Sequence, residues 1–132
     1  MAAVQNFSVD QGTSVKVNFT VKQLTNPNLA YNVITNPYIA INLSGSSIAM
    51  MGRLTYNSSS PLVNWSTTNG KIVITSAVNG LFSLVLLPAD TTTVLFKDDS
   101  VDLVYDIEIT DALLAVTRAF QGTITLSREV TR

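Results

Sequence analysis

Residues 14–22 read SVKVNFTVK, and their alternation of residue types decides the fold class. Val15, Val17, Phe19 and Val21 occupy every second position, and polar or basic residues fill the positions between them. Because successive side chains of a β-strand point to opposite faces, this period of two predicts a strand with one buried and one wet face. Residues 101–110, VDLVYDIEIT, repeat the pattern. Both runs therefore predict strands at the edge of a hydrophobic core.

Shorter runs of the same kind predict further strands at residues 38–43, 48–56, 62–66, 71–77, 81–87, 115–121 and 123–126, with a kink at Gly122. Asn-Gly pairs at 69–70 and 79–80 favour tight turns, while two Asn-Pro pairs predict an irregular loop over 25–37. Residues 84–87, LVLL, are apolar in both phases, which predicts a strand covered on both faces. We expect an all-β chain: a single antiparallel β-sandwich, immunoglobulin-like, of about eight or nine short strands spanning residues 1–132. A closed barrel is the alternative.

One short helical turn is expected near residues 90–96. Asp90 follows Pro88 and can cap the first free N–H groups of such a turn. Val94 and Leu95 would then press on the core.

The composition of the 132 residues excludes several kinds of chemistry. Cysteine and histidine are both absent, so disulfides, thiol nucleophiles, Cys/His zinc sites and a histidine base are excluded. Val, Ile and Thr total 40 residues, which favours strands over helices. The net charge is −1 and the basic residues are scattered, which argues against a nucleic-acid partner. We expect no enzyme activity, no cofactor, no signal peptide and no membrane span.

Charge is uneven along this weakly charged chain. Residues 1–89 carry a net charge of +3, from four bases and one acid, whereas residues 90–132 carry −4, from eight acids and four bases. The difference predicts electrostatic complementarity, either head to tail or between chains, and chance variation in a weakly charged protein is the simpler interpretation.

Two groups of acidic residues are candidates for chemistry. Asp106 and Glu108 lie two positions apart on one strand face, roughly 6 to 7 Å, which is close to the spacing of a glycosidase pair. A solvated strand face is the simpler interpretation. Asp98, Asp99 and Asp102 offer hard oxygen ligands, but they lack the glycine-bearing spacing of a calcium loop. No metal site is predicted from them.

The candidate interface residues lie in and beside the predicted turn at residues 111–115, DALLA. Turns prefer Gly, Asn, Asp or Pro, so Leu113 and Leu114 either pack onto their own core or face a partner. Placing Glu108 opposite Arg118 would pair their charges and set Val104 and Phe120 on the same outward face. Such a mixed face suits contact with another subunit, which gives the candidate interface Leu113, Leu114, Val104, Phe120, Arg118 and Glu108.

The last third of the chain resembles small virion proteins of tailed phages. In that group a pattern YDLEITD…G.VTRLLQGTVTVSPEVTR closes a small β-domain. This chain has VYDIEITD at 104–111, VTR at 116–118, QGTIT at 121–125 and SREVTR at 127–132. Residues 7–19 and PADT at 88–91 are similar to the N-terminal strand and short turn of the same proteins. Leu113 and Leu114 depart from a Gly/Asp turn, and Arg128 stands where proline is usual.

The group also resembles the N-terminal domain of the phage baseplate upper protein. The resemblance implies a structural role in the virion, assembled in the host cytoplasm, as an adaptor at the tail, baseplate or fibre attachment region. Its partners would be other virion proteins and copies of itself. Capsid decoration is an alternative in the same class. A carbohydrate-binding or glycosidase-like module using Asp106 and Glu108 is the alternative of another class.

Overall fold

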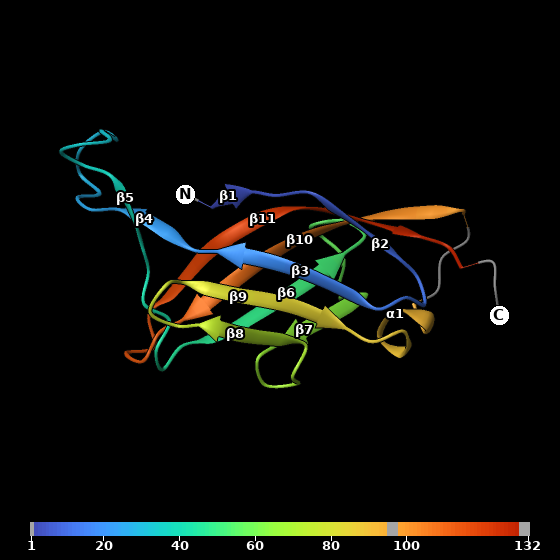
Figure 1. Ribbon diagram of the computed structural model, residues 1–132. Helices are drawn as coiled ribbons and strands as arrows, with labels where there is room; N and C mark the ends of the chain where they lie inside the picture. Colours follow the sequence, from blue (N-terminus) through green and yellow to red (C-terminus); the bar gives the residue numbers. More distant parts are fainter. Residues whose placement is uncertain (1, 95–97, 130–132) are drawn as a thin grey trace.

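The computed structural model describes residues 2–94 and 98–129, and Figure 1 shows its strands lying in two facing layers. One short helix, two main sheets and a small two-stranded sheet make up this part of the chain. The strands are β1 (Ala3–Val4), β2 (Phe7–Asp10), β3 (Val15–Thr20), β4 (Lys22–Leu24), β5 (Tyr38–Ala40), β6 (Ser47–Arg53), β7 (Val63–Ser66), β8 (Ile72–Ser76), β9 (Leu81–Leu86), β10 (Ser100–Thr110) and β11 (Val116–Ser127); the helix is α1 (Ala89–Thr92).

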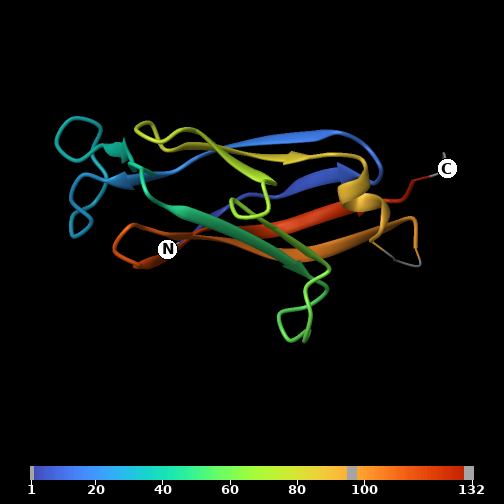
Figure 2. The same cartoon turned by 90° about the horizontal axis from the view of Figure 1, so that it is seen from below.

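The strand order makes the fold immunoglobulin-like. One sheet runs β1-β11-β10-β6-β7, with β2 following β1 along β11, and the other runs β3-β9-β8. Each sheet therefore combines strands that are distant in sequence, as the two sheets of an immunoglobulin sandwich do. Figure 2 shows the layers edge-on, with β4 and β5 projecting from one end. The expected all-β sandwich is confirmed.

The predicted alternation builds the core between the layers. In β10 the side chains of Leu103, Ile107 and Ile109 point inward and are buried. From the opposite sheet, the Phe19 and Phe82 rings stack at 5.0 Å between centroids. Fully burying an aliphatic or aromatic side chain stabilises the fold by about 1.5 to 3 kcal/mol. These facing rows hold the sheets together.

A β-bulge in the β10–β11 hairpin corrects the expectation for Phe120. Glu108 lies opposite Arg118 as predicted, but Ile107 lies opposite Phe120, so Ala119 is an extra residue on β11. An extra residue reverses the inward and outward phase of the strand. Phe120 is consequently only 7% exposed and belongs to the core, and its assignment to an outward face with Val104 was wrong.

The strand β9 corrects a second expectation. Val85 and Leu87 are exposed, because nothing in the described part of the chain covers the outer face of the three-stranded sheet. The prediction of a strand covered on both faces was therefore wrong.

Helix α1 is shorter than predicted, and Asp90 does not cap its first N–H groups as expected. The Asp90 carboxylate accepts a 2.6 Å hydrogen bond from the Leu87 N–H, which precedes the helix, and no side chain caps the helix at Pro88. Asp90 therefore fixes the chain just before the helix, because its carboxylate binds a backbone N–H three residues earlier. Val94 is buried as expected, while Leu95 lies outside the described residues.

Candidate interaction surfaces

One end of the sandwich is formed mainly by loops, and we call it the loop end: residues 3–4, 22–47, 77–81 and 111–116. It includes the projecting β4–β5 segment, the 79–80 turn and the β10–β11 turn, which lie at the same end in Figures 1 and 2. Gly80 packs tightly at its base, since a Cβ there would meet the Val21 carbonyl oxygen at 2.5 Å. The projecting segment is thus joined closely to the body of the sandwich.

The β10–β11 turn presents two leucines to solvent. Oδ1 of Asp111 accepts hydrogen bonds from the N–H groups of Leu113 and Ala115, at 2.9 and 3.0 Å. Leu114 has a φ of 66°, in the left-handed region that favours glycine. Leu113 is 90% exposed and Leu114 80%, so the alternative in which they pack on their own core was wrong.

The projecting segment is organised around a buried amide. Asn36 is 2% exposed, and its Nδ2 donates to the carbonyl oxygens of Asn26, Leu29 and Ala30 at 2.9 to 3.1 Å. The Asn36 amide thus satisfies the backbone carbonyl groups inside the segment, and the apolar side chains point outward. Ile34 is 85% exposed, and the Tyr31 and Tyr38 rings stack at 5.0 Å.

The loop end gathers most of the exposed apolar side chains of the described residues. Eleven of the seventeen large exposed hydrophobic side chains lie there. The eleven are Val4, Leu29, Tyr31, Val33, Ile34, Tyr38, Ile39, Val78, Leu113, Leu114 and Val116. Lys22 and Asp111 are the only charged residues in its segments. Concentrated apolar exposure of this kind is typical of an interaction site, which makes the loop end a candidate.

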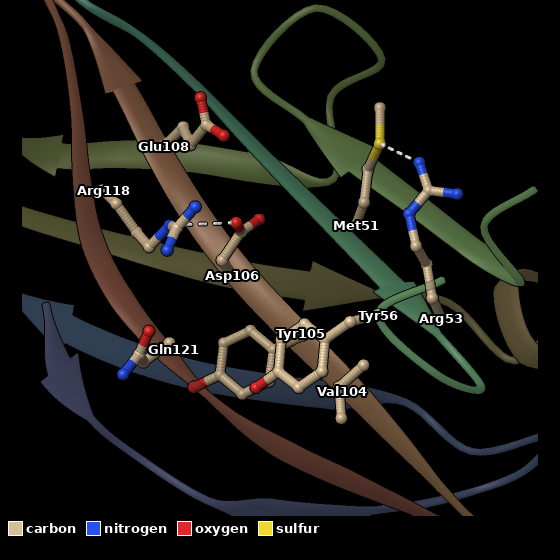
Figure 3. A pocket seen from close by; sticks show the side chains of 9 residues that line it. All are labelled: Met51, Arg53, Tyr56, Val104, Tyr105, Asp106, Glu108, Arg118 and Gln121. Atoms are coloured by element: carbon tan, nitrogen blue, oxygen red, sulfur yellow. Dashed lines mark hydrogen bonds and ion pairs between the residues drawn. The ribbon is translucent and has the colours of Figure 1, made fainter. Parts of the chain in front are cut away.

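A second surface lies on the outer face of the β1-β11-β10-β6-β7 sheet, and we call it the sheet-face groove (Figure 3). It is a shallow hollow of about 320 Å³ lined by Met51, Arg53, Tyr56, Val104, Tyr105, Asp106, Glu108, Arg118 and Gln121. A smaller hollow of about 240 Å³ continues it along β6 and β10 and shares Met51, Asp106 and Glu108. Four residues proposed from sequence, Val104, Asp106, Glu108 and Arg118, therefore meet in one place.

The charges of this groove pair differently from the sequence-based expectation. Arg118 lies opposite Glu108 in the ladder, but its Nε contacts Oδ2 of Asp106 at 3.2 Å. Arg53 donates to the Ser58 carbonyl oxygen at 3.0 Å. In Figure 3 the side chains of Arg118 and Asp106 point toward each other, with Glu108 beyond them. Glu108 has no ion-pair partner among the described residues.

The groove offers polar binding groups with no sign of a buried acid. Asp106 and Glu108 are both half-exposed, whereas a glycosidase acid is generally desolvated in an apolar setting. Burial raises the pKa of Tyr105 to about 12, and its hydroxyl donates to the Gln5 carbonyl oxygen. This phenol therefore stays neutral and ties β10 to the N-terminal segment.

The acidic residues 98–102 do not converge. Asp102 accepts a 2.7 Å hydrogen bond from Thr125 Oγ1, while Asp98 and Asp99 are exposed. Within residues 2–94 and 98–129, no three Asp, Glu, His or Cys side chains are placed to share a metal ion. No helix in this part of the chain has the length and apolar character needed to cross a membrane.

Sequence reasoning missed two components of these surfaces. The apolar content of the projecting segment, LAYNVI at 29–34, was a usable signal, because such residues are unusual in an Asn- and Pro-rich loop. Arg53 and Met51 join the groove through the β6–β10 pairing, for which the sequence has no local signal.

Comparisons with known proteins leave the family open. No protein-family model matches the chain, and no curated protein matches it. Among solved structures, murine CRIg is similar with a TM-score of 0.35 and 12% sequence identity, over 94% of this chain and 92% of that one. At that TM-score the likeness carries no argument, and the fold assignment rests on the strand pairing described above.

Proposed function

We propose that this chain is a non-enzymatic structural protein of a tailed-phage virion, an adaptor at the tail, baseplate or fibre attachment region. Its partners are other virion proteins, which it joins when the virion assembles in the host cytoplasm. The C-terminal signature at residues 104–132 supports the virion assignment. The alternative for the same kind of protein is a position on the capsid, as a decoration protein.

The loop end is the attachment surface in this proposal, and its exposed apolar side chains are the observation that carries it. Burying apolar area stabilises a contact by roughly 25 cal/mol per Å² before the costs of association. Few charges would have to be stripped of water, since Lys22 and Asp111 alone are charged there. The outward leucines at 113 and 114 form its most exposed point.

Incorporation into particles tests the proposal. Phage producing Leu113→Ser with Leu114→Ser should yield particles that contain about tenfold less of this protein, given the apolar area removed. The matched control, Val73→Ser with Leu87→Ser, also removes two exposed apolar side chains but lies outside the loop end. Equal incorporation of both variants, or wild-type protein absent from purified particles, would contradict the proposal. Labelled protein located on the capsid would favour decoration.

A second candidate function is carbohydrate binding in the sheet-face groove. The exposed Tyr56 ring, the Gln121 amide and the two carboxylates together favour it, because sugars bind to aromatic faces and paired polar groups. Asp106→Asn with Glu108→Gln should then abolish binding to host glycans. Loss of glycan binding or cleavage with unchanged particle assembly would favour this function over the adaptor.

A further inference from the structure

We propose that the sheet-face groove is a self-association surface, where two copies of this chain pack face to face with Glu108 of each against Arg53 of the other. The loop end is not involved, so this inference stands or falls separately from the attachment function. It begins from Glu108 and Arg53, which share one face and have no ion-pair partner among the residues that the structure describes.

The strand register fixes where these two charges lie. Asp106 is opposite Met51 in the antiparallel β10–β6 ladder. Glu108 is two residues further along β10, and Arg53 is two residues further along β6, in the opposite direction. With a rise of about 3.3 Å per residue, the two positions are separated by about 13 Å along the strands. Within one chain they therefore sit at opposite ends of a diagonal centred on Asp106 and Met51.

This diagonal makes the face complementary to itself. A two-fold axis that lies in the contact plane and is perpendicular to the diagonal at its midpoint places each Glu108 over Arg53 of the second copy. Two equivalent ion pairs then form, as an isologous contact requires. Glu108 gains an opposite charge that the described part of its own chain does not give it. Arg53 gains a carboxylate in addition to the Ser58 carbonyl oxygen.

The centre of the face suits burial. The charge of Asp106 is already offset by Arg118 in the same chain, at 3.2 Å. Met51 and Val104 supply apolar surface beside it, and the exposed Tyr56 stands at the rim. A central charge that is already paired within its own chain costs less to bury than an unpaired one, and apolar surface lies beside it.

The outer face of the other sheet lacks this complementarity. Lys16 on β3 is the charged residue among its strands β3, β8 and β9, so two copies would bring like charges together without an acid to offset them. Charge complementarity thus favours the groove face over the three-stranded sheet as the place for a second copy.

Reciprocal charge reversal tests the proposal on the purified full chain. Sedimentation equilibrium should show a monomer–dimer equilibrium for the wild type. Arg53→Glu or Glu108→Arg alone should raise the dimer dissociation constant about tenfold, since each loses two ion pairs and gains like-charge contacts. The double variant should return it to within about threefold of wild type, because the charges are exchanged and still opposite.

Controls separate pairing from net charge and from folding. Lys16→Glu and Asp98→Arg make the same changes of net charge on exposed residues elsewhere, and should leave the equilibrium unchanged. Circular dichroism must show the same thermal unfolding for single and double variants, and rescue by the double variant excludes misfolding as the cause. A monomeric wild type, or single reversals that do not weaken the dimer, would overturn the proposal.

Discussion

The two ends of the sandwich differ in how far contacts within the chain satisfy their polar groups and cover their apolar side chains. At the end opposite the loop end, which we call the helix end, the Gln11 amide donates to the carbonyl oxygens of Thr91 and Val94, at 3.1 and 2.8 Å. The buried Thr91 Oγ1 accepts from the Gly12 N–H at 2.8 Å. Gln11 Oε1 accepts in turn from the Glu129 N–H at 3.1 Å. The helix end is therefore closed by its own hydrogen bonds.

The loop end is built in the opposite way. Its internal hydrogen bonds, around Asn36 and Asp111, serve to fix segments that turn apolar side chains outward. Acidic residues lie at the helix end: Asp10 pairs with Ser127, the Asp99 carbonyl oxygen accepts a hydrogen bond from the Arg128 N–H, and Glu129 lies against Gly12. One end of the sandwich thus makes its hydrogen bonds within the chain, whereas the other leaves apolar side chains exposed, as the attachment surface proposed above requires.

The largest effect is expected from opening the closed end. Thr91→Val keeps the shape of the side chain but leaves the Gly12 N–H without its acceptor, which should lower the free energy of unfolding by about 1 to 3 kcal/mol. Urea unfolding followed by tryptophan fluorescence measures the change. Thr93→Val, on an exposed side chain of the same segment, is the control. Equal stability of the two variants would show that the hydrogen bonds of the helix end do not hold it closed.

A smaller, stabilising effect is expected at the loop end. Leu114→Gly removes a side chain held at a φ of 66°, where residues other than glycine are strained. The free energy of unfolding should rise by about 1 kcal/mol. Leu113→Gly, at a position without positive φ, should give no such gain in the same urea titration. A loss of stability in Leu114→Gly would mean that this leucine stabilises the isolated chain, against the comparison.

The smallest effect is a pH dependence at the helix end. Desolvation alone would raise the pKa of Asp90, but hydrogen bonds from Lys71 and from the Leu87 N–H, with the Lys71 charge, outweigh it and lower the pKa. A lowered pKa in the folded chain adds stability above the pKa of the unfolded chain, and this stability is lost as the pH falls below about 4. Asp90→Asn should therefore reduce stability at pH 7 more than at pH 3.

Unfolding midpoints of wild type and Asp90→Asn at both pH values measure this difference. Lys71→Met, which removes the partner 2.8 Å from the carboxylate, should reproduce part of the loss at pH 7. An identical effect of Asp90→Asn at the two pH values would contradict the role of the carboxylate charge.

Much of the fold could be predicted from local patterns, because alternation reports directly which side of a strand is buried. Residues 15–20 of the first run form β3 and residues 101–110 lie in β10, and the alternating apolar positions of both strands face the core. The bulge at Ala119 could not be predicted, since no glycine or turn residue marks it, and the phase of Phe120 was lost with it. The sequence has no local signal for a bulge in which two residues of one strand face one residue of the other.

The candidate surfaces were predictable to the extent that they are local. Leu113 and Leu114 were identified because leucine is unusual in a turn, and the structure exposes them. The partner of Arg118 could not be predicted from register alone, since a long side chain reaches diagonally to Asp106. Arg53 reaches the same groove through a pairing of β6 with β10, which only the folded chain establishes.

The parallel pairing of β2 with β11 has a consequence for synthesis. Phe7 lies beside Ile124, and the Asn6 side chain accepts a hydrogen bond from the N–H of Thr123, 117 residues away. Residues 7–10 are therefore synthesised long before β11, the strand with which they pair. Until then the Phe7 ring, which meets Phe19 and Tyr105 in the finished sandwich, has no β11 to hold it in place. β2 therefore cannot join its sheet, and the sandwich cannot close around Phe7, before β11 has been translated.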